Sequence, residues 1–592
     1  MSGIEDRWRG WGQAGRAAQG LAMALALLTA PAGAQTPALA PDAQAQEGLR
    51  RQEERARQQP ALPPTPELLA PASAASGAPA PLPQESPCFP LRQLRLAGEG
   101  SEAFAWLAEV PARRFVGACL GSAGLALLAR ELDEALLARG YVTSRVSFGP
   151  QNLSGGELVL QLHLGRVAAV RMVQPADAVA GLPEREDTAW GTWRNAVPLR
   201  AGDLLDVRDL EQGVEQMKRL PSQAVRTRIE PGQAPDSSVV VIERPAARLA
   251  DRVRGSLTVD NSGSGSLGRT QAWASVVLDN PAGLNDIASL SLGSNLEHVE
   301  STRRSQSAGL QYSVPWGYST LSLGANHNRF AQYVQGTTVR FLSSGRSETT
   351  DLRLQHTLWR SSSARLGVHG GVVLRRAESY LDDVELIVQR RRTTTAEAGV
   401  QWRRLFERST LEGSLALRQG VGWHDAQDDL PDTGPGSPTL RPRIWAQSAQ
   451  WSTSLPAGWG FRDYTLSLRG QRTHDTTLSV DQIAIGGRGS VRGFSGDTVL
   501  MAESGLVLRN EWVAPLPAAG TPMQLVLGLD WGRVWGPSAQ LLPGQSLAGV
   551  SLGLRGQLAG LLYDLAAGLP LHRPEGFEAH GPSLYLSITH TF

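Results

Sequence analysis

The sequence has little of what a metalloenzyme or a nucleic-acid-binding protein needs. Only two of its 592 residues are cysteines, and its ten histidines show no catalytic-triad signature. The formal net charge is +1, so no overall electrostatic attraction for nucleic acid or acidic lipid is visible. Because no nucleotide or metal motif is evident either, we expect no catalytic residue, no cofactor, no bound metal and no nucleic-acid partner.

Long hydrophobic runs are also missing. The apolar run "LAMALALLTA" at residues 21–30 is too short to span a bilayer as a helix, and no other stretch reaches the roughly eighteen apolar residues required. Arginines precede this run and "AGA" follows it. That order predicts a secretory signal peptide over residues 1–34, cut after Ala34. The alternative is a cytosolic helix.

The two cysteines, Cys88 and Cys119, therefore belong to a chain expected to be exported from the cytoplasm. An oxidising compartment permits a disulfide between them. Two thiols without a nearby histidine would make an incomplete zinc site, so we interpret the pair as a structural clip.

Four regions follow the signal peptide. Residues 35–59 contain a stretch of good helix formers without an apolar stripe, and residues 60–86 are a Pro/Ala-rich linker. Residues 87–166 and 167–246 each combine strands with an amphipathic helix, which makes two βααββ-like units in tandem. The first helix carries Leu125, Leu128, Leu132 and Leu136; the second follows the cap Asp206 and carries Leu210, Val214, Met217 and Leu220. Exposed strand edges of these units could accept an extended peptide.

Residues 247–592 are predicted to be a transmembrane β-barrel. Segments of about ten alternating residues recur there without a helical period, which favours an outer-membrane barrel of about sixteen strands over a soluble sandwich. In the last segment Leu584, Leu586, Ile588, His590 and Phe592 share one face. An aromatic C-terminal residue such as Phe592 is the usual ending of such a barrel, with His590 at the membrane interface.

The stretch "IGGRGSVRGF", residues 485–494, places two arginines among four glycines. A phosphate-binding loop would need a helix after it, yet the next segment, "GLVLRNEWVAP", alternates like a strand. In "MQLVLGLDWGRVW" the apolar side chains point one way, so Asp530 points the other way. If the apolar side faces lipid, Asp530 faces the barrel lumen.

Several stretches together resemble the outer-membrane transporters of two-partner secretion systems (TpsB-type, ShlB/FhaC/HecB family), which export haemolysins and filamentous adhesins. "CFPLRQLRLAG" and the residues after it resemble the first POTRA (polypeptide-transport-associated) domain, including both cysteines of the haemolysin-type branch. "RLPSQAVRTRIEPG" resembles the second. "LTVDNSGSGSLGRTQAWASVVL" and "YSVPWGYSTLSLGANH" resemble the opening barrel strands, and "GGRGSVRGF" resembles the signature loop of the wider outer-membrane assembly superfamily.

This resemblance implies that the loop Val491, Arg492, Gly493 and Phe494 folds into the lumen, where Arg492 meets an acidic residue on the wall. Asp530 is its best candidate, and the alternative is a surface hairpin with a solvated arginine. Arg488 has no essential place in this pattern. By position, residues 41–59 match a helix that plugs the pore.

The sequence thus predicts a mainly β protein of the bacterial outer membrane, with two POTRA domains in the periplasm. It would export a cognate exoprotein of the haemolysin or adhesin type, recognised through the POTRA domains. Membrane lipid and, during biogenesis, the barrel-assembly machinery would be its other partners. The alternatives are a barrel-assembly or insertion factor of the same superfamily and, more distantly, an outer-membrane barrel enzyme.

Overall fold

The computed structural model describes residues 81–592, except 177–182, 188–189, 298–301, 336–337, 430–435, 517–521 and 580. The predicted signal peptide, the helix within residues 35–59 and most of the linker lie outside the described residues. In the part that is described, no helix is both long and apolar enough to cross a membrane.

The first small domain packs two helices on a three-stranded sheet. Its elements are β1 (Phe89–Pro90), β2 (Gln93–Ala97), η2 (Ser101–Phe104), α3 (Trp106–Phe115), β3 (Cys119–Leu120), α4 (Ser122–Ala138), β4 (Arg145–Ser147), η3 (Leu153–Gly155) and β5 (Glu157–His163). The sheet order is β2-β5-β4, with β2 parallel to β5. The predicted leucine stripe of α4 is the core: Leu128, Leu132 and Leu136 are fully buried, and Leu125 is partly buried.

Two features fix the start of α4. Cys88 and Cys119 form a disulfide, so the chain just before β1 is joined to β3. Glu85 accepts hydrogen bonds from the backbone N–H groups of Gly121, Ala123 and Gly124 at 2.9, 2.6 and 2.7 Å. These donors at the helix N-terminus lower the pKa of the Glu85 carboxyl. The chain entering the domain is therefore held by a covalent and a polar contact.

The second small domain has one helix in the described residues, not the two that a βααββ unit would have. It consists of β6 (Arg166–Gln174), β7 (Arg185–Glu186), α5 (Val207–Lys218), β8 (Arg226–Pro231) and β9 (Ser237–Glu243), in the sheet order β7-β6-β9-β8. Turns occupy the described part of the chain where the first domain has α3, and Pro183 and Pro198 disfavour a helix there. Helix α5 begins as predicted, because Asp206 accepts a hydrogen bond from the Arg208 N–H at 2.8 Å.

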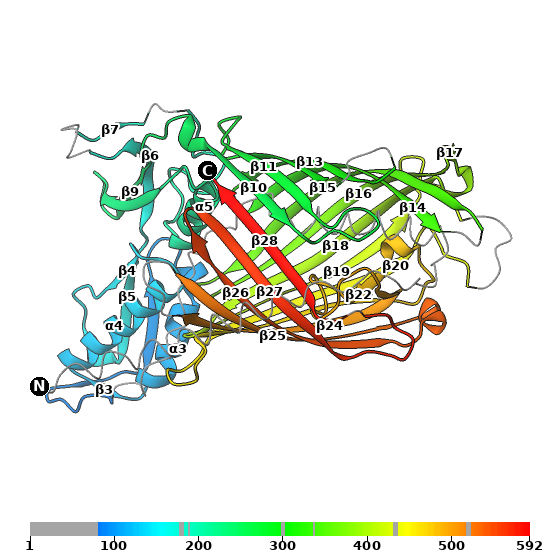
Figure 1. Cartoon of the computed structure of the whole chain (residues 1–592). Helices are drawn as coiled ribbons and strands as arrows, with labels where there is room; N and C mark the ends of the chain where they lie inside the picture. The colour runs from blue at the N-terminus through cyan, green and yellow to red at the C-terminus, as the bar shows by residue number, and fades with distance from the viewer. Residues whose placement is uncertain are drawn as a thin grey trace, which may run out of the picture. The chain divides into compact units, whose positions relative to one another are not determined.

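From Val253 onward, the described residues form a closed antiparallel barrel of sixteen strands, as the alternating pattern predicts. Figure 1 shows neighbouring strands side by side from green β10 to red β28. The strands are β10 (Val253–Asp260), β11 (Gln271–Asp279), β12 (Ile287–Asn295), β13 (Arg304–Trp316), β14 (Ser319–Gln335), β15 (Arg340–Arg360), β16 (Ala364–Leu381), β18 (Arg391–Leu405), β19 (Ser409–Val421), β20 (Arg443–Ser454), β21 (Asp463–Thr473), β24 (Ser504–Leu516), β25 (Met523–Trp535), β26 (Ser546–Leu558), β27 (Leu561–His572) and β28 (Ser583–Thr591).

The ring closes between its first and last strands. β10 pairs with β28 from Ser256↔Thr591 to Asp260↔Ser587. Beyond this ladder, Gly255 and the C-terminal Phe592 exchange two backbone hydrogen bonds, at 2.8 and 3.0 Å. The last residue of the chain therefore takes part in closing the barrel.

Alternation along the strands separates a wet interior from an apolar exterior. Leu352, Leu354 and Trp451 stand on the outer face and remain 40–51% exposed, which suits a surface that meets lipid. The strands are longer than the ten residues expected from the sequence: β14, β15 and β16 have 17, 21 and 18 residues. Since an apolar band needs only about ten residues per strand, their polar ends extend beyond it.

Candidate functional site

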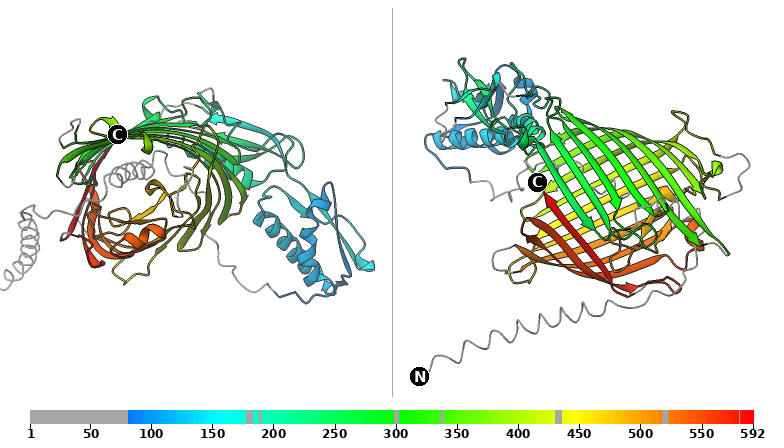
Figure 2. Two further views of the ribbon diagram at one scale, coloured as in Figure 1. Left: turned by 90° about the vertical axis from the view of Figure 1, so that its right-hand side faces the viewer. Right: turned by 45° about the horizontal axis from the view of Figure 1, so that its top comes forward.

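A segment between β21 and β24 leaves the wall and enters the barrel. It contains η6 (Ser479–Asp481) and a two-stranded hairpin of β22 (Ile483–Ile485) and β23 (Leu500–Ala502), and the glycine-rich loop connects the hairpin strands. Figure 2 (left) shows this segment inside the ring of strands. The hairpin packs on the wall through a buried apolar cluster that includes Ile485, Val491 and Leu547.

Arg492 is clamped by the wall residue Asp530. Its Nε and Nη2 atoms donate hydrogen bonds to the two oxygens of Asp530, both at 2.7 Å, and its backbone N–H donates to Oδ2 at 2.9 Å. The residues are 5% and 1% exposed. This two-pronged geometry is one that arginine makes and lysine cannot.

A second carboxylate completes the charge balance around Arg492. Its Nη1 donates to Glu511 on β24 at 2.9 Å, and Glu511 also accepts from Arg555 on β26 at 2.5 Å. Arg555 in turn donates to Asp564 on β27 at 3.0 Å. The result is a line of alternating charges across β24–β27, which the loop meets with Arg492 at one end and, at 3.7 Å from Asp564, with Arg488 at the other.

The residues beside Arg492 fill the space between the loop and the wall. Val491 is fully buried, and the Phe494 ring meets the Phe577 ring edge-on with centroids 5.7 Å apart. The Tyr585 hydroxyl on β28 accepts from the Gly493 N–H and donates to the Phe494 carbonyl, both at 2.9 Å. The Val-Arg-Gly-Phe stretch is thus anchored by three kinds of contact: ionic, apolar and main-chain.

Glycines on the wall let the loop backbone lie against it. A Cβ atom on Gly528 would meet the Arg492 guanidinium, one on Gly549 would collide with the Arg492 carbonyl oxygen, and one on Gly568 would lie 2.7 Å from the Gly493 nitrogen. These glycines lie on three adjacent strands, β25, β26 and β27. They form a shallow seat whose shape depends on missing side chains.

We expect Gly549→Ala to displace the loop. The methyl group would occupy the position of the Arg492 carbonyl oxygen, so the backbone of the residue that Asp530 holds would have to shift. Secretion of the exported partner should fall about tenfold, the effect expected for a loss of about 1.4 kcal/mol in the working conformation. Gly370→Ala on β16 is the matched control, because its Cβ would meet nothing closer than 3.9 Å. Equal secretion by the two variants would contradict the seat.

The structure brings Arg492 and Asp530 together. The alternation along β25 was enough to predict that the Asp530 carboxylate points into the lumen. Sequence analysis missed Glu511 and Tyr585. The same alternation applied to "GLVLRNEWVAP" and "SLYLSITHTF" places both on the inward face, opposite Leu508 and Leu586. Arg488 does not contact Asp530; it donates to the Leu586 carbonyl at 3.1 Å and makes a partly exposed ion pair with Asp564 at 3.7 Å. Among the residues described, no group of histidine, cysteine and carboxylate side chains could hold a metal ion.

A second polar cluster joins α5 to the turns at one end of the barrel. Glu215 on α5 accepts from Arg360 Nη1 at 2.5 Å and from Arg365, which flank the β15–β16 turn. Gln212 and Gln216 donate to the Gly317 carbonyl in the β13–β14 turn at 3.3 and 3.2 Å. Glu215 and Arg360 side chains are 2% and 1% exposed, so this is a buried ion pair.

Burial changes the acid–base properties of neighbouring α5 residues. Asp209 accepts from the Tyr318 hydroxyl at 2.6 Å, and desolvation raises the pKa of its carboxyl. Desolvation likewise lowers the pKa of Arg219, which contacts Ser313 on β13, to about 10. Sequence analysis did not identify this face of α5 as a contact surface, because its residues are polar and a polar stretch does not indicate burial.

A closed sixteen-stranded barrel, two preceding α+β domains and an inward arginine loop define an outer-membrane transporter with POTRA domains. The family described as "Haemolysin secretion/activation protein ShlB/FhaC/HecB" matches residues 236–556, a ShlB-type POTRA domain matches 89–165, and a further POTRA domain matches 166–231. The chain belongs to this ShlB/FhaC/HecB family.

Individual relatives agree with this assignment. The outer membrane transporter CdiB-2 of Burkholderia pseudomallei (strain 1026b) is 35% identical over 86% of this chain and 88% of its own length. The hemolysin transporter protein ShlB of Serratia marcescens is 26% identical over 82% of each chain. The solved structure of CdiB from Escherichia coli has a TM-score of 0.79 at 25% identity, covering 94% of this chain and 100% of that one.

The chain is therefore an outer-membrane transporter of the two-partner secretion class, with its POTRA domains in the periplasm. This assigns the two ends of the barrel. β10 starts directly after the second POTRA domain, so the end that holds Val253 and the α5 contacts is periplasmic. The end that holds Asp260, Arg443 and Trp535 is extracellular.

Proposed function

We propose that the transporter recognises one large exoprotein of the haemolysin or adhesin type in the periplasm and passes it outward through the barrel as an extended chain. The observation that carries this proposal is that the loop covers one part of the inner wall of the barrel and leaves another part exposed. The loop is bound to β24–β28, whereas inward side chains of β20, such as Ser448 and Gln450, remain exposed. A polar, uncovered wall suits a polypeptide whose backbone must stay solvated.

The POTRA domains offer edges on which an extended segment of the exoprotein can pair. Among the described residues, β8 is hydrogen-bonded to β9 on one side only, and β2 is likewise paired only with β5. Ile229 of β8 is 36% exposed. Main-chain pairing would supply affinity at such an edge, and the flanking side chains would select the partner.

The contact can be tested with a photo-crosslinking amino acid placed at Ile229 on β8. In cells that produce the exoprotein, we expect a cross-link to its N-terminal segment, because strand addition brings the two backbones to within about 5 Å. The same probe at Leu541 of η7 (Pro537–Leu541), which is 90% exposed at the extracellular end, is the control. Cross-linking at neither Ile229 nor a β2 position such as Arg95 would argue against recognition by these edges.

The clamp on Arg492 supports a positioning role for the loop within this function. The ion pair lies where the loop meets the wall and holds the loop against it. The named relatives are transporters, which supports a transport function over an enzymatic one. The exposed inner wall at β20 favours a conducting lumen over a barrel-assembly factor.

A further inference from the structure

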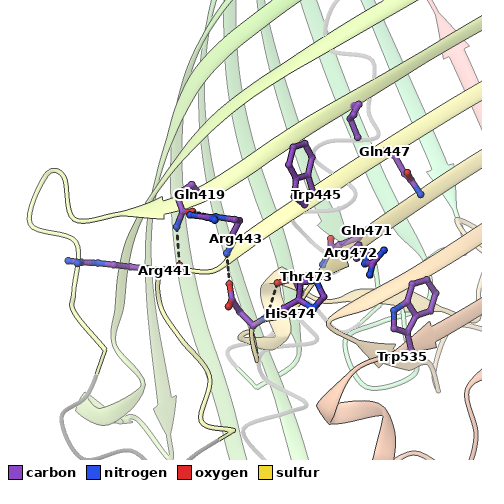
Figure 3. Close-up of a pocket in the computed structure, with 12 residues that line it drawn as sticks. Gln419, Arg441, Arg443, Trp445, Gln447, Gln471, Arg472, Thr473, His474 and Trp535 are labelled. Carbon is purple, nitrogen blue, oxygen red and sulfur yellow. Dashed lines mark hydrogen bonds between the residues drawn. The ribbon is translucent and has the colours of Figure 1, made fainter.

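The outer wall of the barrel has a basic hollow at its extracellular end. A cavity of about 860 Å³ lies over β19, β20 and β21 and extends to Trp535 on β25. Figure 3 shows Arg443, Trp445 and Arg472 among the side chains that line it. This cavity is separate from the arginine loop, whose contacts all lie inside the barrel.

Cross-strand pairing places these side chains on the lipid-facing side. Trp445 pairs with Arg472 on β21, and Arg443 pairs with Gln419 on β19, so they share one face of the sheet. Further down the same face stand Leu415 and Trp451, 37% and 40% exposed. A polar, basic rim therefore lies directly above an apolar surface.

A glycine interrupts this face beside the hollow. Gly470 pairs with Gln447 on β20 and with Leu506 on β24. A Cβ atom at Gly470 would lie 2.7 Å from the Gln447 amide nitrogen and 3.2 Å from Leu506. The side chain of Gln447, one of the residues that line the hollow, therefore takes the space that a larger residue at position 470 would fill.

The charge in this hollow is mainly positive. Three arginines and one aspartate line it, and His474 adds a titratable ring. Arg441 pairs with Asp428, Arg443 Nε donates to Gln419 at 2.8 Å, and the Asp475 carboxylate accepts from the Arg443 backbone at 2.7 Å. Within the described residues, the Arg472 guanidinium has no hydrogen bond or ion pair, so its donors are available.

We propose that this hollow binds the phosphate-bearing headgroup of an outer-membrane lipid. Arginine presents several N–H donors in a plane that suits phosphate oxygens, and Arg443 and Arg472 lie on adjacent strands. Tryptophans such as Trp445 are favoured at the membrane interface. The lipid's acyl chains would run along the apolar face below, past Leu415 and Trp451. A soluble anion would gain nothing from that surface, which favours a lipid.

Native mass spectrometry of the purified full-length protein in detergent would test the proposal, with bis-phosphorylated lipid A as the probe. We expect the Arg443→Gln, Arg472→Gln double variant to retain about tenfold less lipid than the wild type, since each arginine contributes charge-assisted hydrogen bonds. The wild type should bind fully dephosphorylated lipid A as weakly as the double variant binds the bis-phosphorylated form. Arg376→Gln, on the outer face of β16, is the matched control and should change nothing.

Equal lipid retention by the double variant, or equal binding of the dephosphorylated lipid, would overturn the proposal. Displacement of bound lipid by millimolar inorganic phosphate would also overturn it, because the site would then be one for a free anion. Heat-modifiable mobility on gels checks that each variant is a folded barrel. If the double variant is not folded, the Arg472→Gln single variant replaces it. The Arg472 guanidinium makes no hydrogen bond or ion pair in the described structure, so its loss should not affect folding.

Discussion

Arg492→Ala and Asp530→Ala should each lower secretion of the cognate exoprotein about tenfold or more, while the amount of folded barrel in the outer membrane stays near normal. Removing one member of this buried pair takes away the main partner of the other charge, and breaking a buried pair costs about 3–5 kcal/mol where it is measured in proteins. The clamp joins the loop to the wall and is not part of the strand ladder. Its loss therefore displaces the loop before it unfolds the barrel.

The design of the variants separates this contact from general damage. If both residues act through one contact, the double variant should secrete about as little as either single variant. Arg492→Lys should also lose secretion, because an ammonium group cannot make the fork to both oxygens of Asp530. Arg488→Ala, four residues earlier in the same loop, is the control and should secrete normally. Fully additive losses would contradict a shared contact.

Glu215→Gln should separate the second POTRA domain from the periplasmic rim of the barrel. The substitution keeps the shape of the side chain but takes from Arg360, whose side chain is 1% exposed, its buried carboxylate partner and leaves Glu211 at 3.6 Å as the remaining carboxylate. Because a buried charge deprived of its partner costs about 3–5 kcal/mol, we expect the contact to open. Hydrogen exchange should then rise in α5 and in the β15–β16 turn, and secretion should fall about tenfold.

The matched control is Glu134→Gln in α4 of the first POTRA domain. Glu134 pairs with Arg130 at 3.6 Å, and both side chains are about two-thirds exposed. An exposed pair of this kind contributes about 0–1 kcal/mol, so exchange and secretion should stay unchanged. If Glu215→Gln behaves like this control, the α5 cluster does not hold the domain in place.

Sequence periodicity predicted the barrel well, because a two-residue repeat is imposed directly by a wall with lipid on one side and water on the other. The same parity indicated that Asp530 points inward. It could not indicate the glycine seat. Gly528, Gly549 and Gly568 matter because they have no side chain at the positions where the loop crosses the wall. That crossing is a tertiary contact between segments distant in sequence.

Other parts of the structure depend on surfaces that no single segment reveals. The polar residues on α5 look like a solvated helix face in the sequence, and only the barrel turns show that Gln212 and Glu215 are buried. That the described part of the second POTRA domain has one helix is a local effect, which the prolines at 183 and 198 could have indicated. The basic hollow lined by Trp445 can be identified only from the register of three strands, which sequence alone does not supply.

The most direct test of transport through the lumen uses two neighbouring residues on β20. Gln450 points inward and is exposed to the lumen, whereas Trp451 points outward and is 40% exposed on the lipid side. A photo-crosslinking amino acid is placed at one position or the other while an exoprotein with a folded, disulfide-locked C-terminal domain is held in transit. The account predicts a cross-link from position 450 and none from position 451. Cross-links of equal strength at both positions, or from position 451 alone, would contradict it.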